Sequence, residues 1–325
     1  ALFAALRGRG CDVIGRYANS LKAPNSATWL SGMLRDIAPV AIVNATSFSG
    51  KGADGTSPLD AAEVPVFQVA LATSTEAAWA EAERGLSPAD LAMHVVLPEV
   101  DGRLFGGVAS FKEPQPQDEA LQFARYVHSP NAARVSAIAD RVAAWHRLAM
   151  TPPSERRLAL VLSTYPGRDW NLAHAVGLDA IASAEAILGD LRAEGHDAPG
   201  SVTGPDLQDA QIIWPFAAYQ AALARLPETL RDDLQNAWGR AEEDADATEE
   251  GLRLRILRRG NTLIALQPER GTPNLRDAEY HDLSRTPRHA YVAFYLWMQD
   301  QADALIHIGA HGTLEWLPGK SVALS

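Results

Sequence analysis

The stretch Leu158-Ala159-Leu160-Val161-Leu162-Ser163 carries the clearest fold signal in this chain of 325 residues. Five consecutive apolar residues that end at a polar one predict a short buried strand. The segment that follows predicts a helix, with apolar residues at helical spacing from Ile181 to Leu191 and an end at Gly195. A strand followed by a helix in this way indicates an α/β unit.

The C-terminal part predicts a hairpin, a helix and a strand. Residues 252–266 alternate polar and apolar side chains about Arg259-Gly260-Asn261, which predicts a β-hairpin. Thr286-Pro287 is expected to open a helix, and the aromatic stripe between Tyr291 and Met298 is interpreted as core packing. The strand that carries His307 comes next.

The first hundred residues show the same alternation. Strands are predicted at 11–16, 40–44 and 64–69, and a helix at 26–37. This order predicts a mainly parallel sheet covered by helices.

Two local signals follow the last of these strands. Thr73 and Glu76 form a capping box for a helix that ends near Gly85. A hairpin is expected to turn at Asp101-Gly102.

The middle of the chain predicts a linker and a long helix. Pro114-Gln115-Pro116-Gln117 is typical of a linker, and Ser129-Pro130 is expected to start a helix with one apolar face from Val135 to Ala149. We therefore predict an α/β protein with two parallel-sheet units of the Rossmann or flavodoxin type, joined by a long helix and carrying β-hairpin additions. The predicted division is 1–113, 114–152 and 153–325.

The composition excludes some classes of protein. A net charge of −11 argues against nucleic acid as a partner, because phosphate binding needs clustered Lys and Arg. The single cysteine, Cys11, excludes an internal disulfide and agrees with the reducing cytoplasm, where we expect the protein to reside. No apolar run of about 18 residues predicts a membrane span. The acidic run 242–250 is interpreted as a solvated loop.

The candidate functional residues gather in His307-Ile308-Gly309-Ala310-His311-Gly312-Thr313-Leu314-Glu315. If the strand ends at Ile308 or Gly309, His307 lies at the sheet edge where parallel α/β proteins bind ligands. Two imidazoles and a carboxylate suit a late first-row divalent metal, and the same groups can accept protons. On spacing alone, a core histidine with Glu315 as a surface charge remains an alternative.

Other motifs give weaker signals. In Gln267-Pro268-Glu269-Arg270-Gly271, which follows a strand, Arg270 could clamp a carboxylate, and so could Lys320. From the residues alone, an exposed structural charge is the simpler interpretation of both. His281 and His289 are second candidates. We find no phosphate loop, dinucleotide fingerprint, zinc-peptidase motif or Gly-x-Ser-x-Gly elbow.

The run from Ala304 to Ser325 closely resembles the large subunits of the CobN/magnesium-chelatase family. Pro166-Gly167 with Val176 to Asp179, Gln267-Pro268 with Arg270-Gly271, and Gly85 to Leu91 resemble the same family. Trp316-Leu317 is similar to the cobalt branch, whereas the loop 169–174 departs from the small glycine-rich loop of relatives.

The resemblance implies an internal fragment of a CobN-type large subunit of aerobic cobaltochelatase. Such a subunit is expected to act in the ATP-dependent insertion of Co²⁺ into hydrogenobyrinic acid a,c-diamide, in cobalamin biosynthesis, as part of a ligase that forms nitrogen–metal bonds. His307, His311 and Glu315 would hold Co²⁺ transiently and remove protons. Gln267, Arg270 and Lys320 would bind the corrinoid.

The resemblance also implies partners. Separate AAA+ subunits of the CobS and CobT type are expected to hydrolyse ATP with Mg²⁺, and no tightly bound cofactor is expected. We expect the fragment to be inactive by itself. The alternatives are a magnesium-chelatase large subunit that acts on protoporphyrin IX, and a non-catalytic CobN-like protein that binds a corrinoid or metal.

Overall fold

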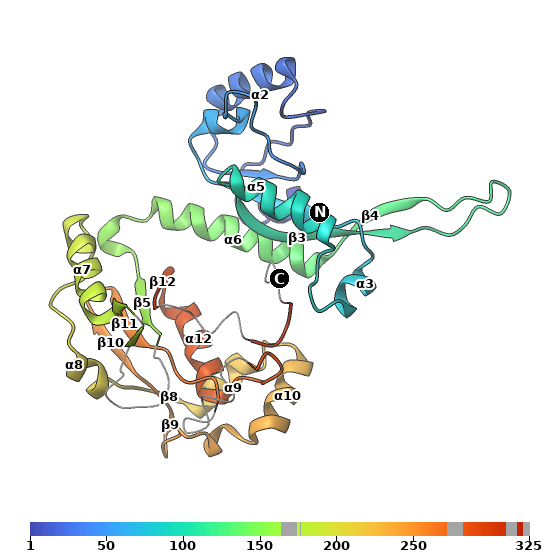
Figure 1. The fold of residues 1–325 in the computed structure, drawn as a ribbon. Helices are drawn as coiled ribbons and strands as arrows, with labels where there is room; N and C mark the ends of the chain where they lie inside the picture. The colour runs from blue at the N-terminus through green and yellow to red at the C-terminus, as the bar shows by residue number, and fades with distance from the viewer. Residues whose placement is uncertain (164–173, 176, 272–281, 310–316, 321–325) are drawn as a thin grey trace. The chain divides into compact units, whose positions relative to one another are not determined.

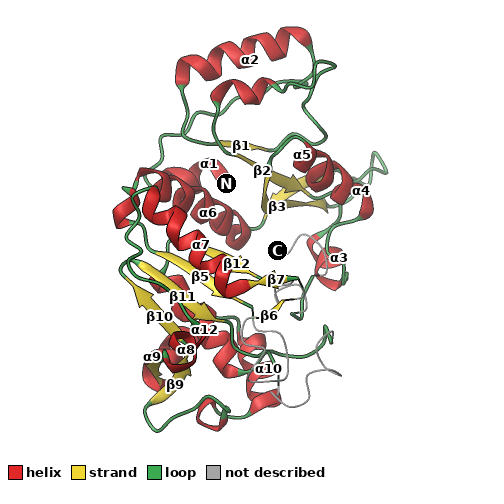
Figure 2. Ribbon diagram, turned by 60° about the vertical axis from the view of Figure 1, so that its left-hand side comes forward, coloured by secondary structure: helices red, strands yellow, loops and turns green. Residues whose placement is uncertain are grey.

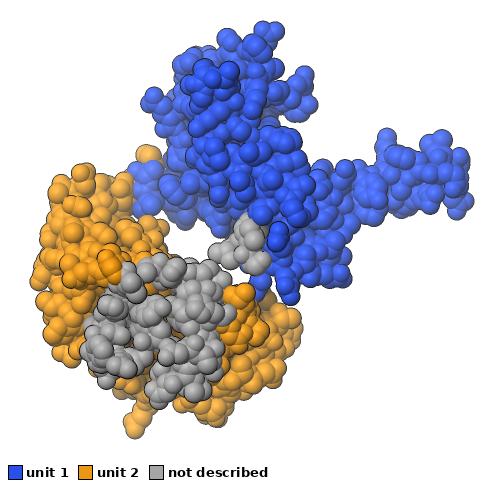
Figure 3. Space-filling view, viewed as in Figure 1, with its two compact units in different colours: residues 1–149, 319–325 blue, residues 150–318 orange. Residues whose placement is uncertain are grey.

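The computed structural model describes residues 1–163, 174–175, 177–271, 282–309 and 317–320. The chain divides into two compact units, residues 1–149 with 319–325 (unit 1) and residues 150–318 (unit 2) (Figure 3). Helix α6 (Ala132–Met150), which the predicted division gave to a separate segment, thus belongs to unit 1 apart from its last residue. Gly319 and Lys320 also belong to unit 1 rather than to the second unit.

Unit 1 is built on a mixed sheet whose described strands run in the order β1-β2-β3-β4. Strands β1 (Ile42–Asn44), β2 (Val66–Leu71) and β3 (Leu104–Pro114) are parallel, and β4 (Tyr126–Pro130) is antiparallel to β3. The β3–β4 pair projects as a two-stranded arm (Figure 1). The predicted linker lies at the end of β3 and in the loop of this arm.

Helices cover both faces of this sheet. Phe67 and Val69 of β2 pack with residues of α1 (Leu2–Arg7) and α6, whereas Ala70 packs with Val95 of the π-helical turn η2 (Ala92–Val96). Successive side chains of one strand therefore enter different cores, as the period of two requires. The other helices of the unit are α2 (Pro24–Ile37), η1 (Pro58–Ala62), α3 (Glu76–Glu81), α4 (Pro88–Leu91) and α5 (Leu97–Val100).

Two local predictions in unit 1, a hairpin turn and a helix N-cap, are wrong. Asp101-Gly102 follows helix α5 and makes no hairpin, because β2 and β3 are parallel and helices α3 to α5 connect them. Thr75, not Thr73, caps α3 by accepting a hydrogen bond from the Ala78 amide at 3.2 Å. The amide and hydroxyl of Thr73 instead donate to the carboxylate of Asp90, each at 3.0 Å.

A predicted strand and the start of a predicted helix in unit 1 also differ from the structure. Residues 11–16 form no strand and pair with none of the strands that the structure describes. Helix α6 begins at Ala132 rather than at Ser129-Pro130, because those two residues extend β4. The Asn131 side chain then accepts a hydrogen bond from the Arg134 amide at 2.9 Å and caps the helix.

Unit 2 contains a second mixed sheet, with its described strands in the order β10-β11-β5-β12 (Figure 2). Strands β11 (Thr262–Leu266), β5 (Leu158–Leu162) and β12 (Ala304–Ile308) are parallel. Strand β10 (Ile256–Arg259) pairs antiparallel with β11, and Arg259 lies opposite Thr262. The predicted hairpin about Gly260 is therefore confirmed.

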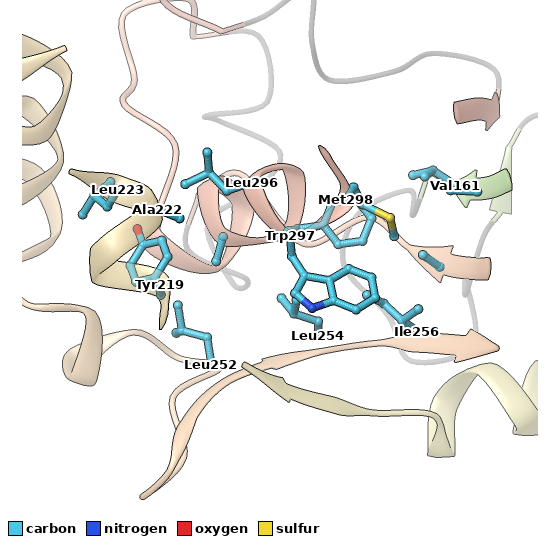
Figure 4. Close-up of a cluster of buried hydrophobic side chains, with 14 of the residues drawn as sticks. Val161, Tyr219, Ala222, Leu223, Leu252, Leu254, Ile256, Leu296, Trp297 and Met298 are labelled. Carbon is cyan, nitrogen blue, oxygen red and sulfur yellow. The ribbon is translucent and has the colours of Figure 1, made fainter. Parts of the chain in front are cut away.

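Strand β5 alternates between two cores. Ala159 and Val161 face the core that contains α9 (Phe216–Leu223), α10 (Glu228–Trp238) and α12 (His289–Gln301), and Leu160 and Leu162 face α7 (Ala180–Ala193) and α8 (Gly204–Asp209). Figure 4 shows the first core, with Trp297 among the side chains that fill it. The remaining elements among the described residues are η3 (Pro153–Glu155), β6 (His174–Ala175), β7 (Leu178–Asp179), β8 (Ile212–Pro215), η4 (Ala241–Glu243) and β9 (Gly251–Leu254).

These two sheets with their helices confirm the α/β class. Both four-stranded sheets are mixed, because each adds one antiparallel strand to three parallel ones, and the described pairs β6-β7 and β8-β9 are antiparallel. The assignment to the Rossmann or flavodoxin type stays a prediction. Within the described ranges, no helix is long and apolar enough to cross a membrane.

Candidate functional site at the carboxyl edge of the second sheet

Three polar residues lie at the carboxyl ends of the parallel strands in unit 2. Gln267 follows β11, Ser163 follows β5, and His307 is the penultimate residue of β12. The Gln267 amide donates to the Leu162 carbonyl and the Ser163 amide to the Ile308 carbonyl, both at 3.0 Å, so the strands remain in register to this edge. Because β12 ends at Ile308, His307 lies where the sequence predicted it, at the strand tip.

These residues also share one face of the sheet. His307 pairs with Val161, whose side chain enters the core that contains α12, and Ser163 lies two residues beyond Val161. Gln267 lies two residues beyond Ala265, which enters the same core. Since side chains alternate with a period of two, all three residues fall on the α12 side of the sheet.

Helix α12 meets this edge with two tyrosines. The Gln267 Nε2 donates to the Tyr295 hydroxyl at 2.7 Å and to the Tyr291 hydroxyl at 3.1 Å. The Tyr295 hydroxyl lies 3.4 Å from the His307 Nε2, and the two rings stack with centroids 6.2 Å apart and an interplanar angle of 21°. Gln267 is only 3% exposed, so the amide predicted to bind substrate is engaged inside the protein.

Ser163 was missed in the sequence analysis as a functional residue. It is buried, and its hydroxyl has no hydrogen-bond partner among the residues that the structure describes. An unsatisfied buried hydroxyl costs free energy, which makes Ser163 a candidate contact for a ligand at this edge. The signal in the sequence was the polar residue that ends the apolar run, at the position where α/β sheets bind ligands.

A buried ion-pair network holds the loop after β11. The carbonyl of Arg270, itself buried, accepts a hydrogen bond from the Arg288 amide at 2.9 Å. The Arg288 guanidinium pairs with Asp244 and Asp246 and donates to the Glu269 carbonyl at 2.8 Å. Two expectations are thereby corrected: Arg270 is not an exposed charge, and the acidic run is not simply solvated, because its aspartates neutralise a buried arginine.

The remaining histidine candidates are separate from this edge. The Tyr219 hydroxyl lies 2.8 Å from the His289 Nδ1, and the His289 Nε2 donates to the Gly239 carbonyl at 3.0 Å. Burial raises the pKa of Tyr219, so its hydroxyl keeps the proton that this contact needs. His289 thus has a structural role in the core, and His281 lies outside the described residues.

Lys320 makes its contacts within unit 1. Its Nζ donates to the carbonyls of Ala80 and Ala82 at 2.6 and 2.8 Å and lies 4.8 Å from the centroid of the Trp79 ring. These carbonyls belong to the C-terminal end of α3, where a cation is favoured. The structure therefore gives Lys320 a structural role.

Two members of the predicted metal-binding set, His311 and Glu315, lie outside the described residues, as do residues 169–173 of the unusual loop. In the part of the chain that is described, no three His, Cys, Asp or Glu residues come together as a metal site. His307 is therefore the one predicted ligand whose surroundings can be described.

We call Ser163, Gln267, Tyr295 and His307 the carboxyl-edge cluster. The imidazole can bind a borderline divalent metal or accept a proton near neutral pH. The other three side chains are neutral hydrogen-bonding groups, and Tyr295 among them contacts the His307 ring directly. The cluster is therefore suited to transient metal or proton binding.

Comparison with known proteins assigns the family. The family model described as CobN/Magnesium Chelatase matches residues 1–325. The chain is 34% identical to the aerobic cobaltochelatase subunit CobN of Sinorhizobium sp and 36% identical to that of Pseudomonas aeruginosa, over 100% and 87% of this chain. The catalytic subunit of cobaltochelatase from Mycobacterium tuberculosis superimposes with a TM-score of 0.78, at 30% identity over 100% of this chain.

Magnesium-chelatase subunits match at lower identity, 25% over the whole chain for the chloroplastic subunit ChlH of Oryza sativa subsp. indica. The chain spans 27% and 24% of the two CobN proteins and 29% of the M. tuberculosis subunit. The match of the family model over the full sequence and the identity to two CobN subunits agree with the terminal motif. The chain belongs to the CobN/magnesium-chelatase family.

Proposed function

We propose that the protein containing this chain is the corrinoid- and metal-binding subunit of an ATP-dependent cobaltochelatase. Its reaction would insert Co²⁺ into hydrogenobyrinic acid a,c-diamide during aerobic cobalamin biosynthesis in the cytoplasm. The observation that carries the proposal is the position of His307 at the carboxyl edge of three parallel strands, beside the neutral groups of the carboxyl-edge cluster. Family membership supports a metal chelatase, and the relatives with the higher identities are cobaltochelatase subunits.

The chemistry of insertion needs weak, open coordination. Co²⁺ must lose water, and protons must leave the ring nitrogens as nitrogen–cobalt bonds form. We propose that His307 and His311 hold Co²⁺ transiently and that Glu315 accepts a proton. An incomplete ligand set favours transfer to the ring, because a closed four-ligand site would retain the ion.

The corrinoid carries carboxylates, so a cation near the edge would bind it. We propose Arg270 for this role, because its position three residues beyond Gln267 keeps it near the end of β11. For Gln267, the hydrogen bonds to two tyrosines favour an indirect role over direct contact with the substrate. The contacts of Lys320 with α3 likewise favour stabilisation of unit 1.

The energy source would lie on other chains. The sequence has no phosphate loop, so we propose that AAA+ partners of the CobS and CobT type hydrolyse ATP with Mg²⁺. The chain described here is a minority of its relatives' length, and we expect it to be inactive when isolated.

The test is reconstitution of the full-length subunit with its ATPase partners, using either hydrogenobyrinic acid a,c-diamide with Co²⁺ or protoporphyrin IX with Mg²⁺. We expect ATP-dependent formation of the cobalt corrinoid, detected by absorbance, and loss of that activity in Glu315→Gln. Turnover of protoporphyrin alone would assign the protein to the magnesium branch. Tight corrinoid binding without turnover would favour the non-catalytic binding protein.

A further inference from the structure

The Tyr295 hydroxyl lies between the buried Gln267 side chain and His307 at the sheet edge. The hydroxyl accepts the hydrogen bond from the buried Gln267 Nε2 at 2.7 Å and faces the His307 Nε2 at 3.4 Å. The ring packs edge-on against Phe294, with centroids 5.2 Å apart, and lies 5.1 Å from Tyr291. Helix α12 and strand β11 therefore fix the Tyr295 ring, and that ring stacks on His307.

The contact with Tyr295 involves one of the two imidazole nitrogens of His307, Nε2, and which group donates depends on the imidazole tautomer. A tyrosine oxygen has two lone pairs, and Gln267 donates to one of them. The second lone pair can accept the Nε2 hydrogen of a neutral imidazole, whose Nδ1 then carries the lone pair that a metal requires. The separation of 3.4 Å is long for a hydrogen bond, so ring stacking supplies part of the orientation.

We propose that Tyr295 is a positioning residue that directs the Nδ1 of His307 toward the incoming metal ion, with Gln267 fixing the Tyr295 hydroxyl. The proposal rests on the proposed function, because it presumes that His307 receives Co²⁺. It gives Gln267 a role in metal delivery in place of the substrate contact predicted from the sequence. Loss of a group that orients a metal-binding histidine typically lowers metal affinity about 10- to 100-fold.

The same unit offers a matched control. Tyr219 and His289 form another tyrosine–histidine contact, at 2.8 Å, which is buried among α9, α10 and α12 in the core, whereas the Tyr295–His307 contact is part-buried. Tyr219→Phe and Tyr295→Phe each remove one hydroxyl from such a pair. A purely structural role for Tyr295 would make the two variants alike.

The experiment measures steady-state Co²⁺ insertion by the full-length subunit with its ATPase partners, varying Co²⁺ and corrinoid in turn. We expect Tyr295→Phe to raise the KM for Co²⁺ about tenfold or more, with the KM for the corrinoid within about twofold of wild type. Gln267→Met should act in the same direction. Tyr219→Phe should lower the unfolding midpoint and leave both KM values unchanged.

The outcomes separate this proposal from the proposed function. If His307→Ala abolishes the use of Co²⁺ while Tyr295→Phe keeps the wild-type KM for Co²⁺, positioning by Tyr295 is refuted and the proposed function stands. If Gln267→Met raises the KM for the corrinoid instead, Gln267 contacts substrate and the proposed chain of contacts is wrong. If His307→Ala leaves the KM for Co²⁺ unchanged, both proposals fail.

Discussion

The buried ion-pair network in unit 2 allows a sharp stability prediction. The side chains of Arg288 and Asp244 are 4% and 2% exposed, and the guanidinium also pairs with Asp246. Arg288→Met would leave the Asp244 carboxylate buried, with backbone donors such as the Ala290 amide in place of a cation. Removing one partner of a buried pair costs about 3–5 kcal/mol, because the remaining charge cannot regain its hydration.

Another pair in the same unit supplies the control. Arg157 and Asp303 approach to 2.6 Å but are 48% and 31% exposed. For an exposed pair we expect Arg157→Met to cost about 1 kcal/mol or less. Because both variants replace the arginine of an Arg–Asp pair with methionine, the difference between their costs measures the effect of burial on the pair.

The assay is hydrogen exchange of the α12 amides in the full-length subunit, which reports the local free energy of opening. At about 1.4 kcal/mol per tenfold change, Arg288→Met should raise the opening constant by about two to three and a half powers of ten. Arg157→Met should change it by less than about tenfold. Equal effects of the two variants would refute the assignment of Arg288 as the anchor between α12 and the loop after β11.

Three further predictions concern unit 1. Burial lowers the pKa of His94 below its ordinary value of 6.5 against the opposing charge of Asp90, so the unfolded chain binds the proton first. The stability that His94 contributes is complete above about pH 6.5 and is lost as the pH falls toward the pKa of His94 in the folded protein. The unfolding midpoint should therefore fall between about pH 7 and 5, and His94→Gln should make this fall smaller. An unchanged dependence of the midpoint on pH in His94→Gln would contradict the prediction. Asp101→Asn should cost about 3–5 kcal/mol by urea unfolding, because the Asp101–Arg103 side chains are 1% and 2% exposed; a cost below about 1 kcal/mol would contradict the buried pair. Lys320→Ala should cost about 1 kcal/mol and leave the KM for the corrinoid unchanged, whereas a tenfold rise in that KM would support substrate binding.

The sequence predicted best where one local pattern determined the structure. The continuous apolar run at β5 is enough to predict a strand that is buried on both faces. Gly260 is enough to predict the β10–β11 hairpin, because a two-residue turn depends on local sequence. The position of His307 at a strand tip followed for the same reason.

Predictions from the sequence were wrong where a residue distant in the sequence binds the side chain in question. Thr73 has a good capping pattern, but the buried carboxylate of Asp90 takes both of its donors and the cap moves to Thr75. The acidic run looks solvated until Arg288, more than forty positions away, pairs with two of its aspartates.

Contacts between residues that are far apart in the sequence depend on how the elements pack in three dimensions, which a single sequence does not reveal. The carboxyl-edge cluster shows the same limit. Gln267, Ser163 and His307 lie at one edge of the sheet because three strands stay in register, and Tyr295 contacts Gln267 and His307 from a helix that reads as ordinary core. Sequence spacing joined His307 to His311 and Glu315, whereas its neighbours from other elements became visible only in the fold.

Metal delivery by His307 is tested most directly by the rate of Co²⁺ insertion at varied Co²⁺, compared between wild-type and His307→Ala full-length subunits, with corrinoid binding measured in parallel. We expect kcat/KM for Co²⁺ to fall at least about 100-fold in His307→Ala while corrinoid affinity stays within about twofold, because the imidazole acts on the metal. Wild-type kcat/KM for Co²⁺ in His307→Ala would contradict metal delivery at the carboxyl edge of the second sheet.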